Sequence, residues 1–313
     1  MSVAVIIVNY NSGALLDRCL QSLLAQTFCA DELVVVDNAS TDAESQSFLD
    51  AITTATVIRS ETNLGYGGAI NLAVRTIDTP DYIVCLNPDA FPEPDWLEAM
   101  VNAADSHPDY GSFASLMLRE DDTSVVDGAG DELHFTGIPW RRFHQQELHD
   151  NLQTEPVFSA CAGAALYRTV LFNQLGGFDD VYFMYVEDID LGFRLQLAGY
   201  PCLFVRDAIV HHIGSAVTGE GSDFSVYFGH RNLVYCYFKN MPLLLLLTTL
   251  PFHILANLVT LIVLAVKGRG GAIGKAKLDA LKKLPSAIRA RNNVSRKVSS
   301  RHIWRLLNKS MIR

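Results

Sequence analysis

The chain has few cysteines, and they show no pairing pattern. There are six in 313 residues, most lie within apolar stretches, and none forms a Cys-x-x-Cys pair: Cys19, Cys29, Cys85, Cys161, Cys202 and Cys236. This arrangement argues against a disulfide framework or a zinc site and favours reduced, buried thiols in a cytosolic compartment. The N-terminus also lacks a basic region before its first apolar run, which argues against a signal peptide.

Acidic residues are almost absent from the C-terminal part of the chain. Residues 241–313 hold 14 Lys and Arg but a single acid, Asp279, whereas residues 1–240 hold 11 Lys and Arg against 33 Asp and Glu. The net charge of −9 therefore combines −22 in the first part with +13 in the second. Such a split indicates that the two parts face different partners. We expect one domain over residues 1–239 and an extension over residues 240–313.

No internal repeat is present, and the first ninety residues alternate apolar runs with helical patterns. The runs at 3–8, 33–36 and 82–86 are typical of strands buried on both faces of a sheet, and a shorter strand is expected over residues 56–59. Between them, leucines at helical spacing predict a helix to about Gln26. The capping-box spacing of Thr41 and Glu44 predicts the start of another helix. This alternation predicts an α/β fold with a doubly wound, mostly parallel sheet.

The pattern weakens between about residues 95 and 160, where we expect mixed loops and short strands. Beyond this region a helix is predicted from about Asp188 to Ala198, where Gly199 ends it. A strand over residues 202–205 then leads to the segment 209–212.

The junction at Asn87, Pro88 and Asp89 is the most informative point of the pattern. Pro88 cannot continue a strand ladder, so the chain leaves the sheet there and delivers Asp89 to its carboxyl edge. Open α/β folds bind their ligands at this edge. Taken alone, Asp89 could simply cap a turn. However, the strands that end at Asn9 and Asp37 bring polar side chains to the same edge, and this repetition favours a ligand crevice.

The residues at this edge suit different parts of a nucleotide ligand. Asp37 could accept hydrogen bonds from a nucleobase or ribose, or cap the following helix. Asp89 could coordinate Mg²⁺ or Mn²⁺ on a diphosphate, since these cations prefer oxygen ligands. Gly65, Gly67 and Gly68 would let backbone N–H groups approach a phosphate, or form a helix entry turn. Their spacing matches neither a Rossmann fingerprint nor a P-loop, which argues against dinucleotide redox chemistry and ATP hydrolysis.

Three carboxylates begin the helix predicted near residue 188. Glu187, Asp188 and Asp190 complement the positive end of a helix dipole, but their mutual repulsion is costly. This cost favours a catalytic task for at least one of them, such as that of a general base. His211 and His212 lie at the end of a strand, where one is a candidate metal ligand or a hydrogen-bonded core histidine.

Six motifs occur in a fixed order over residues 3–240: Val8-Asn9-Tyr10-Asn11, Val36-Asp37-Asn38-Ala39-Ser40, Asn63-Leu64-Gly65-Tyr66-Gly67, Asn87-Pro88-Asp89, Gly177-Phe178-Asp179 and Glu187-Asp188-x-Asp190-Leu191. This ordered set resembles family 2 glycosyltransferases, and above all bacterial rhamnosyltransferase-like members that build surface polysaccharides. The resemblance implies a GT-A fold, a dTDP- or UDP-sugar donor, a divalent cation (Mg²⁺ or Mn²⁺) and inversion at the anomeric carbon. It further implies transfer of a sugar, with rhamnose suggested, to a hydroxyl of a growing cell-surface polysaccharide or lipid-linked glycan.

The resemblance also assigns roles to individual residues. Asp188 matches the family's catalytic base, which deprotonates the acceptor hydroxyl as it attacks from the face opposite the diphosphate. Asp37 matches the nucleobase-binding aspartate, and Asp89 the last, metal-binding carboxylate of the D-x-D motif. The first position of that motif is Asn87 here, a neutral departure that leaves fewer charged ligands for a metal ion.

Further residues complete the expected site. The donor is expected to contact Asn9, Asn11, Asp37, Asn38, Asn63, Gly65, Gly67, Asn87 and Asp89. The metal ion is expected on Asp89 and His211, which matches a histidine that helps to bind metal in the family, with His212 as the alternative register. Acceptor-side or supporting roles are expected for Glu187, Asp190, Gly177 and Asp179.

The C-terminal part is predicted to meet a membrane. Residues 241–266 carry no formal charge and are long enough to span a bilayer, but Pro251, His253 and Asn257 interrupt the apolar run. Because a nucleotide-sugar donor is cytosolic, one crossing would place the basic tail outside, against the positive-inside tendency. We therefore expect a hairpin or in-plane segment on the cytoplasmic face of the inner or plasma membrane, with Lys and Arg near anionic lipid. The alternative is a buried helix of an oligomer or soluble core.

Three other functions fit part of the pattern. Nucleic-acid binding by the basic tail is opposed by the acidic part, which would repel a polyanion. A nucleotidyltransferase shares the strand-end carboxylates but normally needs a basic phosphate-binding loop, and residues 9–13 contain no Lys or Arg. A non-catalytic nucleotide-sugar-binding or scaffold subunit of a polysaccharide assembly is the remaining alternative, against which Asp89 and Asp188 argue.

Overall fold

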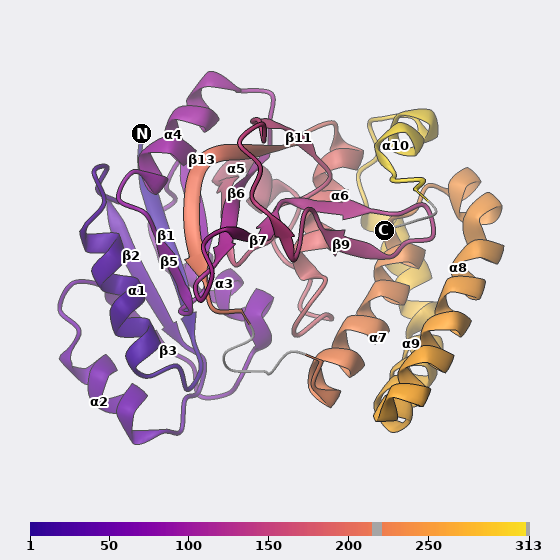
Figure 1. Ribbon diagram of the computed structural model, residues 1–313, viewed down its shortest axis with the longest axis horizontal. Coiled ribbons are helices and arrows are strands. Elements are labelled where there is room, and N and C mark those ends of the chain that lie inside the picture. Colours follow the sequence, from indigo (N-terminus) through magenta and orange to yellow (C-terminus); the bar gives the residue numbers. More distant parts are fainter. Residues whose placement is uncertain (215–220, 311–313) are drawn as a thin grey trace.

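An 11-stranded sheet crosses the centre of the structure, a computed structural model that describes residues 1–214 and 221–310 (Figure 1). Its strands are β1 (Val3–Asn9), β2 (Glu32–Asp37), β3 (Thr56–Arg59), β4 (Tyr82–Leu86), β5 (Ala90–Pro92), β6 (Ser112–Arg119), β7 (Val125–Ala129), β10 (Gln146–Glu147), β11 (Glu155–Val157), β12 (Ala164–Arg168) and β13 (Cys202–His212). Their order is β10-β7-β6-β12-β4-β1-β2-β3, and β13 pairs with β6, β5 and β11. A separate two-stranded sheet contains β8 (Asp131–Leu133) and β9 (Pro139–Arg141).

The first four strands form the parallel part that the sequence predicts. β1 lies between β2 and β4, β3 pairs with β2, and all three pairings are parallel. Ile6 and Val8 of β1 pack in one hydrophobic cluster, whereas Val5 and Ile7 pack in another on the opposite face. Both faces of β1 and β4 are covered, which explains their continuous apolar runs, whereas β3 at the edge is only partly buried. Because the strands are parallel, their carboxyl ends share one edge.

Helices pack on the sheet and continue beyond it: α1 (Ala14–Leu24), α2 (Ala43–Ala51), α3 (Gly65–Thr76), α4 (Trp96–Ser106), α5 (Thr169–Gln174), α6 (Glu187–Ala198), α7 (Asp223–Asn240), α8 (Leu243–Leu264), the π-helical η1 (Ala265–Arg269), α9 (Gly270–Ala290), the 3-10 helix η2 (Arg291–Asn293) and α10 (Ser300–Leu306). α6 confirms the helix predicted over residues 188–198. The predicted capping box of Thr41 and Glu44 is wrong. α2 begins after Asp42, whose carboxylate accepts a hydrogen bond from the Ser45 amide (2.7 Å) and so satisfies the first turn itself.

The region in which the sequence pattern weakens supplies much of the antiparallel half of the sheet. β12 pairs antiparallel with β4 and β6, and β7 pairs antiparallel with β6. β13 is longer than predicted: it runs parallel to β6 with an irregularity between Val205 and Ile209, and so joins the two predicted segments. Its end places His212 opposite Ala90 of β5, directly after the turn that carries Asp89.

All six cysteines are free, as their spacing predicts. Cys19, Cys85, Cys202 and Cys236 are buried. Burial raises the pKa of Cys202 and of Cys236 to about 12, so these thiols stay protonated at neutral pH.

The three long C-terminal helices lie together at one end of the molecule, with α8 along its outer edge (Figure 1). Tyr227 of α7 donates to Asp279 of α9 (3.0 Å), and Arg291, just after α9, donates to the carbonyl of Phe238 near the end of α7 (2.6 Å). α7 and α9 therefore run parallel, and α8 connects them in the opposite direction. The turn from α8 into α9 contains Gly268 at a φ of 82°.

The change in composition at residue 239 does not separate two hydrophobic cores. One cluster combines Phe158 and Phe193, which precede residue 239, with Met241, Leu245 and Ile303, which follow it. The two regions are thus packed against each other, and the experiments below use the full chain.

Candidate active site

The carboxyl ends of β1 and β2 bring a first group of predicted residues together. Asn9 is fully buried, and its Nδ2 donates to Oγ of Ser40 (2.9 Å) and to Oδ1 of Asp37 (3.3 Å). Asn11 has a φ of 53°, and its Oδ1 accepts the backbone N–H of Thr41 (2.8 Å). The backbone N–H of Ser40 also donates to Asp37 (3.2 Å). These contacts fix Asp37 in one orientation at the sheet edge.

Asn38 and Asn63 form a second group beside the first. Nδ2 of Asn38 donates to Oδ1 of Asn63 (3.1 Å) and to the carbonyl of Gly65 (3.2 Å), and its Oδ1 accepts the N–H of Leu64 (2.8 Å). Oδ1 of Asn63 also accepts the N–H of Gly65 (2.9 Å). The start of α3 is therefore tied to the end of β2.

Gly65 and Gly67 lie inside the first turn of α3, where close packing requires glycine. Gly65 has a φ of 73°, and a Cβ there would lie 2.0 Å from the carbonyl oxygen of Phe183. A Cβ on Gly67 would lie 2.8 Å from Cβ of Phe178. The glycines thus let α3 pack against the segment that precedes α6, which accounts for them independently of any phosphate.

Asp89 and His212 lie side by side after β4 and at the end of β13. Nε2 of His212 is 3.3 Å from Oδ1 of Asp89, and its Nδ1 is 2.8 Å from Oδ2 of Asp127. His211, the expected metal ligand, contacts Glu93 instead, at 2.9 Å between Nε2 and Oε1. Neighbouring residues of a strand point to opposite faces, so only one of the two histidines can face Asp89. The geometry favours the alternative register, His212.

Asp127 on β7 connects two sides of the site, and no sequence pattern singles it out. Its Oδ2 accepts from Nη1 of Arg141 (2.5 Å) as well as from His212. Burial alone would raise the pKa of Asp127, but hydrogen bonds with His144 and His212 and the charge of Arg141 hold it well below its usual range. The ionised Asp127 favours the proton of His212 on Nδ1 and leaves Nε2 directed at Asp89.

A cavity of about 350 Å³ opens beside the sheet edge. Residues from several distant segments line it, including Asn87, Trp140, Arg141, Tyr185, Glu187 and Asp188. Among the residues predicted to contact the sugar donor, Asn87 is the one that lines this cavity within the described chain. Its backbone N–H donates a hydrogen bond to the carbonyl of Gly163 (2.9 Å). Asn9 and Asp37 lie outside the lining, so the site has two parts.

Asp188 lines this cavity from the first turn of α6. Its Oδ2 accepts the backbone N–H of Ala162 (3.2 Å), and its Oδ1 accepts that of Ile189 (2.8 Å). Burial raises the pKa of Asp188, although these N–H groups and Arg141 act against the rise. Burial and the charge of Asp188 raise the pKa of Glu187. The two N–H groups that donate to Asp188 stabilise its ionised form. The pair therefore favours a proton on Glu187 and an ionised carboxylate on Asp188.

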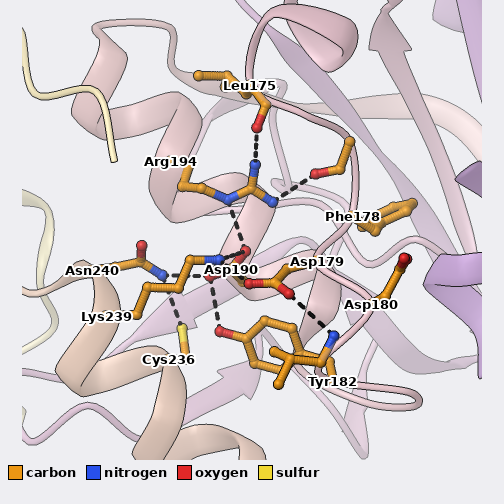
Figure 2. A network of polar contacts seen from close by, with 12 residues as sticks. Leu175, Phe178, Asp179, Asp180, Tyr182, Asp190, Arg194, Cys236, Lys239 and Asn240 are labelled. Carbon is orange, nitrogen blue, oxygen red and sulfur yellow. Dashed lines mark hydrogen bonds and ion pairs between the residues drawn. The ribbon is translucent and has the colours of Figure 1, made fainter. Parts of the chain in front are cut away.

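Asp190 points away from solvent into a network of ion pairs (Figure 2). It is fully buried and accepts from Tyr182 (2.8 Å) and Asn240 (2.7 Å), and it pairs with Arg194 (2.8 Å) and Lys239 (2.9 Å). Burial would raise the pKa of Asp190, but the two cations hold it well below its usual range. These contacts favour a supporting role for Asp190.

Gly177 and Asp179 belong to the same network. The carbonyl of Gly177 accepts from Nη2 of Arg194 (2.7 Å), and Oδ2 of Asp179 pairs with Lys239 (2.7 Å). Gly177 has a φ of 67°, and a Cβ there would lie 2.5 Å from Oδ1 of Asn71. Both residues therefore anchor the segment that leads to α6.

Trp140 and Arg141 line the cavity although no sequence motif predicts them. They lie on β9, in the region where strand and helix patterns are weak. Arg141 also donates to Sγ of Cys161 (3.4 Å), which lines the same cavity. Trp140 donates through its indole N–H to Glu132 (3.0 Å). An aromatic and a basic residue in one short strand carry no motif, so only the fold reveals their place.

Comparison with known proteins identifies the family of the chain. Glycosyl transferase family 2 matches residues 4–176. The chain belongs to this family. It is 31% identical over 239 residues to the N-acetylglucosaminyl-diphospho-decaprenol L-rhamnosyltransferase of Mycobacterium tuberculosis (strain CDC 1551 / Oshkosh), covering 69% of this chain and 77% of the relative. It is 25% identical over 213 residues to the O-antigen chain rhamnosyltransferase WbaN of Salmonella anatum, covering 67% and 66%. The chain is thus a rhamnosyltransferase-like member of the family.

Solved structures agree on the fold. GalNAc-T7 with UDP, GalNAc and Mn²⁺ matches with a TM-score of 0.62 and 18% identity, over 76% of this chain and 48% of that chain. The mannosyltransferase PcManGT from Pyrobaculum calidifontis, in complex with GDP-Man and Mn²⁺, matches with a TM-score of 0.55 and 20% identity, over 93% and 84%. The predicted α/β fold of GT-A type is confirmed.

Proposed function

We propose that this glycosyltransferase inverts the anomeric centre and depends on a divalent cation. It moves a sugar from a nucleotide-diphosphate donor to a hydroxyl of a lipid-linked glycan or growing polysaccharide. The observation that carries the proposal is Asp188, a hydrogen-bonded carboxylate in the cavity that opens beside Asn87 at the sheet edge. Such a group, next to a place for a diphosphate, suits direct displacement at a sugar carbon.

Asp188 is the proposed general base of this displacement. The acceptor hydroxyl attacks the anomeric carbon from the face opposite the diphosphate and transfers its proton to the carboxylate of Asp188. The bond between the anomeric carbon and the diphosphate oxygen breaks as the new glycosidic bond forms. A positioned base of this kind typically contributes about 10²–10⁴-fold in rate.

Asp89 and His212 are the proposed ligands of the cation. Nε2 of His212 is buried and lies 3.3 Å from Oδ1 of Asp89, so the two groups face each other as two ligands of one cation would. Within residues 1–214 and 221–310, no group of three His, Cys, Asp or Glu side chains is placed to hold a metal ion. The cation would therefore rely on donor phosphates for further ligands, which is usual for Mg²⁺. When bound, it would stabilise the charge of the leaving diphosphate.

The donor is proposed to be a dTDP- or UDP-sugar. Asp37, held by Asn9 and Ser40, would accept the imide N–H that thymine and uracil share. Both relatives described above are rhamnosyltransferases by name, and one of these names specifies a diphospho-decaprenol-linked N-acetylglucosamine. These names support rhamnose as the sugar and a lipid-linked glycan as the acceptor.

A panel of nucleotides tests the proposed function. dTDP, UDP and GDP are added to the full-length protein with and without Mn²⁺, and the melting temperature is measured. At a hundredfold excess over Kd, a binder adds about 2.7 kcal/mol of stability. The nucleotide-sugars of the best binders are then assayed for transfer, and NMR of the product gives its anomeric configuration. Retention of configuration, or turnover that is unaffected by chelators, would contradict the proposal.

α8 is the proposed contact with the cytoplasmic face of the membrane. It begins the one segment in the described chain that is long and apolar enough to cross a bilayer. Only 11% of the most apolar stretch of this segment is buried inside the protein. Its outward side chains are at least 44% exposed: Leu243, Leu244, Leu247, Phe252, Ile254, Leu255, Leu258, Val259, Ile262 and Val263. An apolar face of this size favours contact with lipid.

The basic residues around α8 favour an in-plane position over a crossing. Lys267 and Arg269 lie in the turn at the end of α8, and inserting them into the bilayer core would be costly. α9 carries further lysines along its length, including Lys275 and Lys282, so the α8–α9 hairpin cannot enter lipid as a pair. With α8 in the interface, these cations would meet anionic headgroups.

Liposome flotation tests the membrane contact. Leu255→Ser combined with Leu258→Ser should reduce binding to anionic vesicles, whereas Val170→Ser, at an exposed apolar residue on α5, should not. Binding should weaken at high salt, since each basic residue near the surface contributes about 1 kcal/mol. Equal flotation of all three proteins would contradict this placement.

A further inference from the structure

Three residues just before α6 have backbone conformations that L-amino acids rarely adopt. Phe183, Tyr185 and Val186 have φ values of 65°, 65° and 74°. Left-handed backbone is costly for bulky side chains, and most of all for a β-branched residue such as Val186. Such conformations persist only where surrounding contacts determine them, and they gather at functional sites. We call residues 181–186 the presenting loop, because they lead directly to Glu187 and Asp188.

Asn232 of α7 holds the presenting loop through its side-chain amide. Its Nδ2 donates to the carbonyls of Tyr182 (2.9 Å), Met184 (2.8 Å) and Tyr185 (2.8 Å), so two amide hydrogens serve three acceptors. Its Oδ1 accepts from Nε of Arg231 (2.8 Å). Asn232 is 1% exposed, so water cannot replace these hydrogen bonds.

One further side chain and one backbone N–H complete this hold. Nη2 of Arg231 donates to the carbonyls of Val181 (3.1 Å) and Tyr182 (2.9 Å). The carbonyl of Phe183 accepts the backbone N–H of Tyr66 in α3 (2.8 Å). Every carbonyl from residue 181 to 185 is therefore bound by α7 or α3, and Asn232 binds three of the five.

The presenting loop controls where α6 begins. Val186 is the residue before the first turn, and its carbonyl accepts the N–H of Asp190 (2.9 Å). Met184, Tyr185 and Val186 also line the cavity next to Asp188. A return of Val186 to negative φ would rotate the start of α6 and move Asp188 away from the N–H of Ala162.

We propose that Asn232 is a positioning residue: it holds the presenting loop in its left-handed form and thereby sets the place of Asp188 in the cavity. The proposal rests on the base role of Asp188 in the proposed function. Asn232 lies outside residues 4–176, the part of the chain that matches the family. The C-terminal helices thus contribute to the site without lining the cavity.

Hydrogen exchange tests the hold itself without any substrate. In Asn232→Ala, amide exchange over residues 181–190 should become faster than in the wild type. The matched control is Asn71→Ala, which removes another buried asparagine that donates to the preceding segment, at the carbonyl of Phe178 (2.7 Å). This control should leave exchange over residues 183–190 close to the wild-type rate. Equal exchange in wild type and Asn232→Ala overturns the proposal.

Kinetics test the consequence for the base, using the donor that gives turnover in the nucleotide panel. Asn232→Ala should lower kcat by roughly 10–100-fold, since a displacement of about 1 Å can cost 10²-fold, while the Kd of the nucleoside diphosphate stays unchanged. Adding Val186→Gly should recover part of this kcat, because glycine adopts positive φ without the cost that valine incurs.

The outcomes separate the two proposals. If kcat and nucleotide affinity fall together in Asn232→Ala, and Val186→Gly recovers neither, Asn232 has only a structural role and the inference fails. If the wild type transfers no sugar from any donor, the proposed function fails, while the exchange rates still decide whether Asn232 holds the loop.

Discussion

The two parts of the candidate site are built in different ways. On the sheet edge, Asn9, Asp37 and Asp89 each lie at or directly after the end of a buried strand, so local sequence places them. Around the cavity, Asp188 and Arg141 depend on contacts between distant segments. Arg141 contacts Cys161, 20 residues away, and Asn232, which holds the segment before Asp188, is 50 residues from Tyr182. We therefore expect the proposed nucleobase contact to depend on the parallel strands, whereas the proposed base depends on long-range polar contacts.

The largest expected effect concerns the network of Asp190, on the cavity side. Asp190→Asn leaves the buried cation Arg194 without its charge partner and Lys239 with Asp179 alone, and should lower the free energy of unfolding by about 3–5 kcal/mol. Asp50→Asn, which breaks an exposed pair with Arg59, should change it by about 0–1 kcal/mol. Denaturant unfolding measures both. Similar losses would show that the network is not what holds α6 in place.

The same network gives a dependence of stability on pH. The pKa of Asp190 is lower in the folded chain than in the unfolded chain, where it is about 3.9. Its contribution to stability is therefore present above about pH 4 and is lost as the pH falls further. The difference in unfolding free energy between wild type and Asp190→Asn should shrink in acid. A difference that is the same at pH 7 and pH 3 would contradict this assignment.

A smaller effect is expected at Asp127, which joins the two parts of the site. Asp127→Ala removes the carboxylate that orients His212, and should weaken Mn²⁺ binding in the presence of dTDP or UDP by roughly 10–100-fold. Isothermal titration calorimetry measures this affinity. Asp121→Ala, an exposed carboxylate that pairs with Arg119, is the control and should bind Mn²⁺ as the wild type does. Unchanged affinity in Asp127→Ala would exclude His212 as an oriented ligand.

The smallest change is expected in the pH dependence of kcat. Burial raises the pKa of Asp188, and the charge of Arg141 acts against that rise. Arg141→Gln should therefore raise this pKa further. Because a base works only when deprotonated, the acidic limb of the kcat profile should move to higher pH. Arg142→Gln, whose partners are Glu132 and Glu155, should leave the limb in place. A shift to lower pH in Arg141→Gln would contradict the role of Asp188.

The sequence predicted the parts of the structure that depend on local patterns. The parallel strands β1–β4, the helix α6 and the GT-A fold follow from apolar runs, helical spacing and the ordered motifs, and all are confirmed. The cap of α2 was wrong by one residue, since Thr41 and Asp42 are both good cap residues and only the fold shows which one is used. The sequence could not decide between His211 and His212 as the proposed metal ligand, because that choice depends on the direction in which each side chain points from β13.

The cavity side could not be predicted from residue patterns. Arg141 and Asp127 lie in short antiparallel strands, whose pairing partners are far away in sequence. Asn232 lies in a helix with no motif, and the three left-handed residues that it holds include two aromatics and a valine, types that predict strand rather than this conformation. Their roles follow only from contacts that the fold creates.

The most direct test of the account is the kinetics of Asp188→Asn in the full-length protein. We expect kcat for sugar transfer to fall by roughly 10²–10⁴-fold, because asparagine cannot accept the acceptor's proton. The Kd of the nucleoside diphosphate with Mn²⁺ should stay at the wild-type value, since the sheet edge proposed to bind it does not include Asp188. Wild-type turnover in Asp188→Asn would contradict the account, and so would a loss of nucleotide affinity equal to the loss of rate.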